Sequence, residues 1–246
     1  MRRLLTGWIG AMAVFGLCFG QEKVAPEGPL EHPLKPLLWK VEGEEIQGTV
    51  WLFGTIHLGK GPLATLHPAA EVALTGADVV CTEVPLDMAT QLGLAKHFIR
   101  DDGKKLGDSI GAELSTQLDA ELKAINPMLN AIPFQSFKTW AVAVTLPMLE
   151  MQMTGEKALD MIIWEKGAAA GKTMGALEKP ADQFSIFDGL KEEEQIVLLS
   201  EGLRMQKEAR VEGKNPIGDL VEAYLSGEVE RVEDEMVRNF AEMIGR

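Results

Sequence analysis

Four short apolar runs alternate with longer stretches of helical spacing, and this alternation constrains the fold more than any other feature of the sequence. The runs cover residues 37–41, 49–53, 78–84 and 173–177. Their length and their β-branched residues are typical of strands, and the short connection between the first two predicts a hairpin. Because helices are expected between and after these runs, the sequence predicts an α/β protein with a small central mixed sheet and many surrounding helices.

A side chain able to bind metal lies at or just beyond the end of three of the four runs. His57 comes after the second run, Glu83 lies near the end of the third, and Glu178 follows the fourth. Ligands of open α/β sheets collect outside the carboxyl ends of the strands, so these side chains are candidates for one site. One imidazole and two carboxylates are part of a ligand set for Zn²⁺, Mn²⁺ or Fe²⁺. Taken singly, each could instead serve a turn or a helix cap.

Composition restricts the class of protein. Hydrophobic residues make up 46% and charged residues 25% of the chain, as in a globular protein with a sizeable core. The net charge of −13 leaves no basic face for a phosphate backbone, which argues against nucleic-acid binding. The sequence also lacks a Gly-x-Ser-x-Gly elbow, a P-loop, a His-Glu-x-x-His helix and a dinucleotide fingerprint, which disfavours serine-triad and nucleotide chemistry.

The first residues have the pattern of an export signal. Two arginines precede an uncharged, mostly apolar stretch, so we expect residues 1–20 to be a signal peptide and 21–36 a proline-rich linker. The remaining protein is then expected to be periplasmic or extracellular, without a stable membrane span. A retained membrane anchor is the alternative, and lipidation of Cys18 is disfavoured because bulky Leu17 precedes it.

For several other residues the sequence predicts a structural role rather than a catalytic one. Cys81 lies in an apolar run and is expected to be a buried hydrophobe. His67 precedes a helix start and is expected to cap it, whereas His32 and His97 are expected to be structural or solvent-facing. Pro147 is expected to interrupt its helix.

From about residue 37 onward, the chain resembles the TraB/PrgY/GumN family, whose relatives include the Tiki metalloproteases. The first matching block contains a Leu-Trp-Lys-Val strand, a Gly-x-x-His motif ending at His57, and a helix exit leading to Glu83. A later block has a Gly-x-Asp-like segment with Asp160, and a Leu-Glu…Gln element with Glu178 and Gln183.

The resemblance implies an α/β fold like that of erythromycin esterase-like and ChaN-like proteins. It also implies a divalent-metal-dependent hydrolase acting on peptides, with Mn²⁺, Co²⁺ or Zn²⁺ as cofactor. Carried over by position, His57 and Glu83 are the expected metal ligands, and Glu83 and Glu178 the expected catalytic carboxylates. The alternative is a non-catalytic periplasmic protein that binds a peptide, another small molecule, a metal or haem.

The family has a second Gly-x-x-His near its C-terminus, and this chain has no histidine after His97. We therefore expect the domain at residues 37–246 to be C-terminally incomplete or naturally short. Either case favours the binding alternative, because half of the family's proposed metal site lacks a counterpart here.

Overall fold

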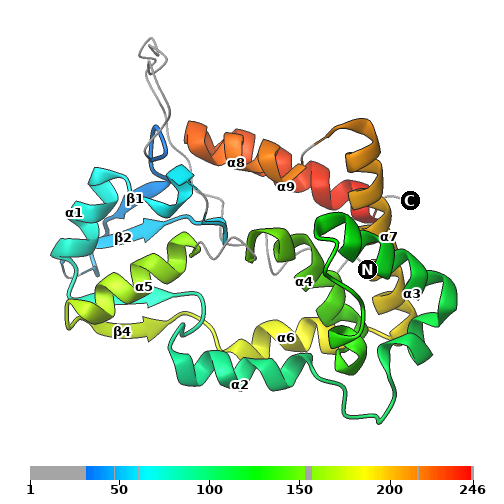
Figure 1. Cartoon of the computed structure of the whole chain (residues 1–246). Helices are drawn as coiled ribbons and strands as arrows, with labels where there is room; N and C mark the ends of the chain where they lie inside the picture. Colours follow the sequence, from blue (N-terminus) through cyan, green and yellow to red (C-terminus); the bar gives the residue numbers. More distant parts are fainter. Residues whose placement is uncertain (1–31, 47, 60, 153–156, 215, 245–246) are drawn as a thin grey trace. The chain divides into compact units, whose positions relative to one another are not determined.

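The computed structural model describes residues 32–244 except 47, 60, 153–156 and 215 (Figure 1). The expected signal peptide and all but the last five residues of the expected linker lie outside the described residues. Within the described part, nine α-helices accompany four short strands, which confirms the α/β class. The strands form two separate two-stranded sheets where one mixed sheet was expected.

The first sheet is the hairpin expected from the sequence. Strand β1 (Leu38–Val41) pairs antiparallel with β2 (Val50–Phe53), and Leu38 lies opposite Phe53. The backbone N–H of Gly54 donates to the carbonyl of Leu37 at 2.8 Å, which extends the pairing by one residue. The chain therefore leaves β2 in a fixed direction toward His57.

The second sheet is a parallel pair with a helix across it. Strand β3 (Val79–Thr82) pairs with β4 (Thr173–Ala176), and α5 (Leu159–Ala169) precedes β4 and contacts both strands (Figure 1). A Cβ at Gly167 would lie 3.2 Å from Val80 Cγ2, so the glycine lets α5 pack closely on the sheet. Because the strands are parallel, both carboxyl ends reach the same edge, where the first turn of α5 also lies.

Helix α1 (Pro68–Gly76) begins as its sequence predicts. His67 is the N-cap, and its Nδ1 accepts a hydrogen bond of 3.0 Å from the N–H of Ala69. Pro68 occupies the first turn, where its missing N–H leaves no intrahelical bond unmade. The expected capping role of His67 is confirmed, and the ring of His32 packs edge-on against it, with centroids 4.8 Å apart.

The remaining helices are α2 (Met88–Phe98), α3 (Leu106–Ile125), α4 (Thr139–Gln152), α6 (Pro180–Asp188), α7 (Glu192–Glu212), α8 (Pro216–Ser226) and α9 (Val229–Ile244). Single-turn 3₁₀ helices occupy Gly61–Ala64 and Pro133–Ser136. His97 of α2 packs on the ring of Phe184, with centroids 5.7 Å apart, which agrees with its expected structural role. Among the described residues, no helix has the length and apolarity needed to cross a membrane.

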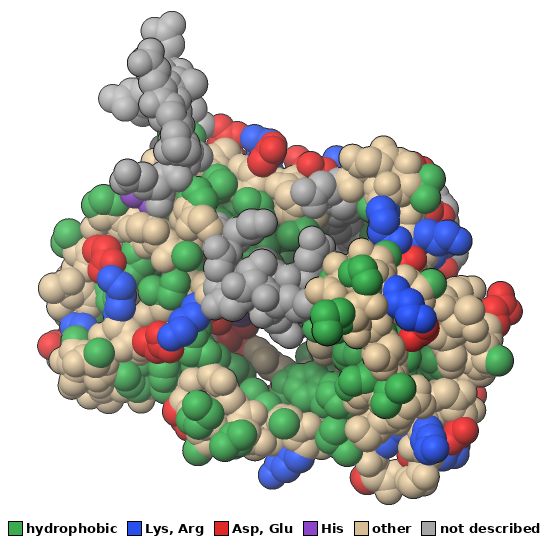
Figure 2. All heavy atoms as spheres, in the orientation of Figure 1, with side chains coloured by type: hydrophobic (Ala, Val, Ile, Leu, Met, Phe, Trp, Pro, Cys, Tyr) green, Lys and Arg blue, Asp and Glu red, His purple; other side chains and the backbone are tan. Residues whose placement is uncertain are grey.

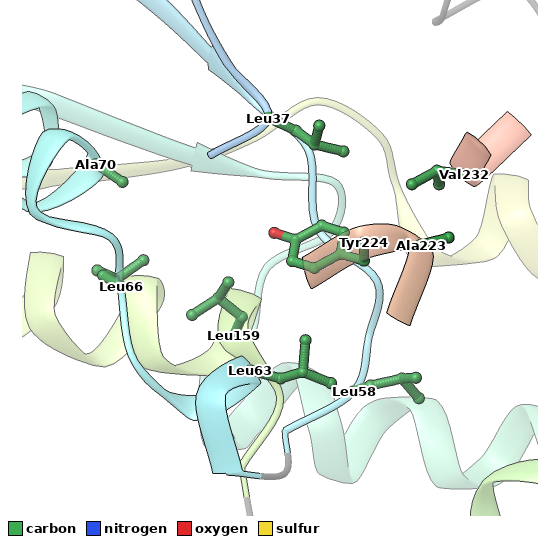
Figure 3. Close-up of a cluster of buried hydrophobic side chains, with 9 residues drawn as sticks. All are labelled: Leu37, Leu58, Leu63, Leu66, Ala70, Leu159, Ala223, Tyr224 and Val232. Atoms are coloured by element: carbon green, nitrogen blue, oxygen red, sulfur yellow. The ribbon is translucent and has the colours of Figure 1, made fainter. Parts of the chain in front are cut away.

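Buried side chains form two clusters. The hairpin cluster joins the first sheet, α1, α5, α8 and α9 (Figure 3), and its buried members are Leu37, Leu58, Leu63, Leu66, Ala70, Leu159, Ala223, Tyr224 and Val232. The helical cluster lies among α3, α4 and α7, and its buried members are Leu106, Ile110, Leu114, Leu118, Leu122, Val142, Leu146, Leu199 and Leu203. Leu58 and Leu159 are neighbours in sequence of His57 and Asp160, so the hairpin cluster fixes the backbone at both of these residues.

Two local expectations were wrong. Helix α4 runs through Pro147, because packing of its buried Val142 and Leu146 against α3 and α7 holds the helix together despite the missing hydrogen bond. Cys81 is exposed rather than buried. Burial alternates along β3, since α5 covers only the face that carries Val80 and Thr82.

Candidate functional site

His57 lies between two carboxylates that come from different elements. Its Nδ1 is 3.3 Å from Oδ2 of Asp160 in the first turn of α5, and its Nε2 is 3.7 Å from Oε2 of Glu83 after β3. The first contact is a hydrogen bond, whereas the second is an ion pair too long for direct hydrogen bonding. The expected pairing of His57 with Glu83 is therefore present, and Asp160 adds a second partner.

The two carboxylates differ in exposure. The Asp160 side chain is 19% exposed and that of Glu83 is 57% exposed. One oxygen of Asp160 bonds His57, while Oδ1 is buried with no hydrogen-bond partner among the described residues. Buried carboxylate oxygens are normally hydrogen-bonded, so Oδ1, which lacks a partner in the described part of the chain, is an unusual feature of this site.

The carboxylates control the charge of the imidazole. The hydrogen bond to Asp160, and after it the interaction with Glu83, raise the pKa of His57 to about 10. The same contact with His57 lowers the pKa of Glu83, and the Gln183 side chain adds a smaller lowering effect. At neutral pH the ring of His57 is thus an imidazolium between the side chains of Asp160 and Glu83, with the Gln183 amide beside Glu83.

Close backbone packing explains how the cluster is assembled. A Cβ at Gly59 would lie only 1.7 Å from the carbonyl oxygen of Lys157, two residues before the start of α5. The absence of a side chain at Gly59 therefore allows the His57 loop to lie directly against the beginning of this helix. Buried Leu58 and Leu159 anchor the two segments on either side.

Glu178 lies beside this cluster through its backbone. Its N–H donates to the carbonyl of Glu83 at 2.8 Å, which continues the parallel pairing of β3 and β4 past their last assigned residues. The side chain of Glu178 is exposed. Among the described hydrogen bonds and ion pairs, none joins it to His57 or Glu83. The structure thus brings Glu178 to the expected sheet edge but joins only two of the three expected side chains directly.

The donor set can be tested against a divalent ion. Nitrogen and oxygen ligands about 2.0–2.2 Å from a tetrahedral ion lie about 3.4 Å from each other, close to the 3.7 Å between His57 Nε2 and Glu83 Oε2. Asp160 on Nδ1 matches the carboxylate–histidine arrangement that orients metal-binding imidazoles. Among the described residues, however, no group of three or more His, Cys, Asp or Glu is arranged to hold a metal. Within the described part of the chain, His57 and Glu83 thus form at most a two-residue ligand set.

Residue-level reasoning did not find Asp160 and Gln183. Asp160 opens an apolar helix, and an acidic residue in a first turn usually needs no explanation beyond the helix dipole. Gln183 lies in the first turns of α6 (Pro180–Asp188) and carries no chemical signal of its own. The only sequence signal for either residue was its position in a block that resembles the family.

The fold and the cluster together define an α/β protein with a histidine held between two carboxylates where parallel strands end. The chain belongs to the TraB/PrgY/gumN family, whose model matches residues 37–245. The resemblance noted in the sequence is therefore confirmed. No curated protein and no solved structure matches the chain significantly.

Proposed function

We propose that this protein is an exported, divalent-metal-dependent hydrolase acting on peptides, with His57 and Glu83 as metal ligands. The observation that carries the proposal is the position of His57 between Asp160 and Glu83, at 3.3 Å and 3.7 Å. Membership of the TraB/PrgY/gumN family supports it. Export rests on the signal-like pattern of residues 1–20.

Each residue has a distinct role in this proposal. Asp160 accepts a hydrogen bond from Nδ1–H of His57, which fixes the ring and leaves Nε2 directed at Glu83. Binding of an ion at Nε2 requires loss of the proton there, so binding releases a proton. Glu178, next to Glu83 at the same sheet edge, is the candidate general base, because its carboxylate is exposed and not joined to His57.

The bound ion would supply a water of lowered pKa and polarise the substrate carbonyl. With two protein ligands, Mn²⁺ or Co²⁺ would complete its coordination shell with water molecules. The half-exposed imidazole and the exposed Glu83 leave the cluster open to a substrate from solvent.

Peptide hydrolysis in the presence of Mn²⁺ or Co²⁺ tests the proposal. The purified protein, a His57→Ala variant and a His97→Ala variant are compared on a mixture of peptides, with cleavage followed by mass spectrometry. His97 is the matched control because its ring packs on Phe184 and has no contact with His57, Glu83 or Asp160 among the described interactions. We expect cleavage by the protein and by His97→Ala, abolished by a chelator and by His57→Ala. Equal cleavage by His57→Ala would overturn the assignment.

The second candidate is a non-catalytic binding protein for a peptide, a metal or haem. The observation that favours it is the lack of a third metal-binding side chain in the described part of the chain. This function predicts saturable binding of a divalent ion or haem in calorimetry, with no peptide cleavage under any metal condition. Turnover, or absence of binding for both ligands, would remove its support.

A further inference from the structure

An apolar groove lies next to the histidine–carboxylate cluster. The turn between β3 and α2 forms one wall with the first turn of α2, and one face of α5 forms the other. The residues that characterise it are Leu86, Met88, Gln91, Lys157, Met161 and Trp164. In Figure 2, hydrophobic side chains are visible on the surface over the region of α2 and α5.

The wall on α5 is a second apolar face of a helix that already has one. Met161, Trp164 and Ala168 are spaced by three and four residues and therefore share one side of α5. The other side packs Ile163 into the hairpin cluster and Gly167 onto the parallel sheet. A helix that is apolar on both sides is typical of a fully buried position, yet Met161 and Trp164 remain partly exposed here. The face is thus available to an apolar group from outside.

The charged groups of the groove are already engaged. Lys157 Nζ pairs with Glu165 at 2.6 Å, and Asp87 caps α2 by accepting bonds of 2.9 and 2.7 Å from Thr90. Lys157 and Glu165 offset each other, and Asp87 leaves one net negative charge in the lining, so the groove disfavours an acidic ligand while its apolar surface favours a neutral apolar group. Gln91 borders the groove, and its amide nitrogen already donates to the carbonyl of Leu86 at 2.8 Å and to Sδ of Met161 at 3.8 Å. The described hydrogen bonds do not use its Oε1, which can accept from a peptide N–H.

The residues that line the groove are close neighbours, along the chain, of the cluster residues. Met161 directly follows Asp160, and Leu86 comes three residues after Glu83. Lys157 is the residue against which the His57 loop packs through Gly59. A chain held at the cluster would therefore present its neighbouring residue to the groove.

We propose that the groove binds an apolar side chain of an extended peptide whose backbone lies at the histidine–carboxylate cluster, and so selects substrates with Leu- or Met-like residues near the cleavage site. This inference rests on the proposed function, because it assumes that the cluster is where the peptide backbone reacts. Flexible methionine side chains beside a tryptophan suit several apolar shapes, so preference should follow apolar size more than branching.

The test separates binding preference from hydrolysis. Blocked tripeptides, acetyl-Ala-X-Ala-amide with X as Leu, Ala or Asp, are titrated into the purified protein by calorimetry and assayed for cleavage with Mn²⁺. We expect the Leu peptide to bind about tenfold or more tighter than the Ala peptide, since it buries several more methyl and methylene groups. The Asp peptide should bind most weakly.

Three substitutions to lysine make the test specific. Met161→Lys and Met88→Lys each put a cation into the groove. They should reduce the ratio of the affinities for the Leu and Ala peptides to about one and increase the affinity for the Asp peptide. Met88 is 71% exposed, so its variant remains informative even if Met161→Lys does not fold. Met128→Lys is the control, because Met128 is 88% exposed and lies outside the groove.

The outcomes are separable. A preserved Leu preference in both groove variants, or equal binding of the Leu and Ala peptides by the unchanged protein, would overturn the groove proposal whether or not cleavage occurs. Leu preference that the groove variants remove, without any cleavage, would uphold the groove and count against the hydrolase.

Discussion

The contact of Gly59 with the start of α5 gives the sharpest prediction about how the site is assembled. In a Gly59→Ala variant, the new Cβ would lie 1.7 Å from Lys157 O, whereas ordinary contacts begin at 3.4 Å. One of the two segments must therefore move by about 1.7 Å, the difference of these distances. Such a shift would lengthen the 3.3 Å contact between His57 and Asp160 beyond hydrogen-bonding distance.

The expected cost is that of inserting a methyl group into a closely packed contact, about 1–3 kcal/mol of unfolding free energy. For a chain of this size, this corresponds to a melting temperature lower by about 2–12 °C. The pKa of His57 should fall from about 10 toward 6.5, because its main partner, Asp160, moves away. Thermal unfolding gives the first quantity, and NMR titration of the histidine ring gives the second.

Gly202→Ala is the matched control. Gly202 lies inside α7, and a Cβ there would meet no atom within 4 Å. Alanine should stabilise that helix by about 0.5–1 kcal/mol. If Gly59→Ala were as stable as the unchanged protein and left the His57 pKa in place, the account of how the loop meets α5 would be refuted.

Three further changes test the electrostatics and the core. The folded-state pKa of His57 lies above 6.5, so the charged ring contributes its full share to the free energy of unfolding below pH 6.5 and loses it as pH rises to about 10. In pH-dependent denaturation, an Asp160→Asn variant should show a smaller loss over this range. Burial lowers the pKa of His67, and the neighbouring His32 lowers it further. Because Nδ1 of His67 caps the helix as an acceptor, the cap is present above pH 6.5 and is lost as pH falls through the lowered pKa. His67→Ala should cost roughly 0.5–1 kcal/mol near neutral pH and little in acid, and an equal cost at both would contradict the cap. Leu118→Ala, at a fully buried position, should cost about 2–5 kcal/mol in denaturant unfolding, and a loss below 1 kcal/mol would contradict the helical cluster.

The sequence was most informative where local patterns decide the structure. The hairpin of β1 and β2, the capping of α1 by His67 and the strand before Glu83 all follow from short-range spacing and side-chain chemistry. Placing Glu83 and Glu178 at strand ends also followed from the sequence, and their backbones do meet. These features need no knowledge of which segments pack together.

Features that depend on long-range packing were beyond the sequence alone. The hydrogen bond of His57 with Asp160 joins residues 103 positions apart, and apart from the family resemblance no local pattern at Asp160 predicts it. The exposure of Cys81 depends on which face of β3 receives α5, and a four-residue apolar run does not reveal that. The division of the strands into two sheets depends on which strands pair with each other, and strand propensity does not predict that.

Calorimetric titration of Mn²⁺ into the purified protein shows directly whether His57 and Glu83 together hold a divalent ion. We expect one saturable site per chain, with binding lost in His57→Ala and Glu83→Ala and retained in His97→Ala. Glu178→Ala should also bind, since its proposed role is that of a base and not of a ligand. A protein that binds no Mn²⁺, or a His57→Ala variant that binds it as tightly as the unchanged chain, would contradict this expectation.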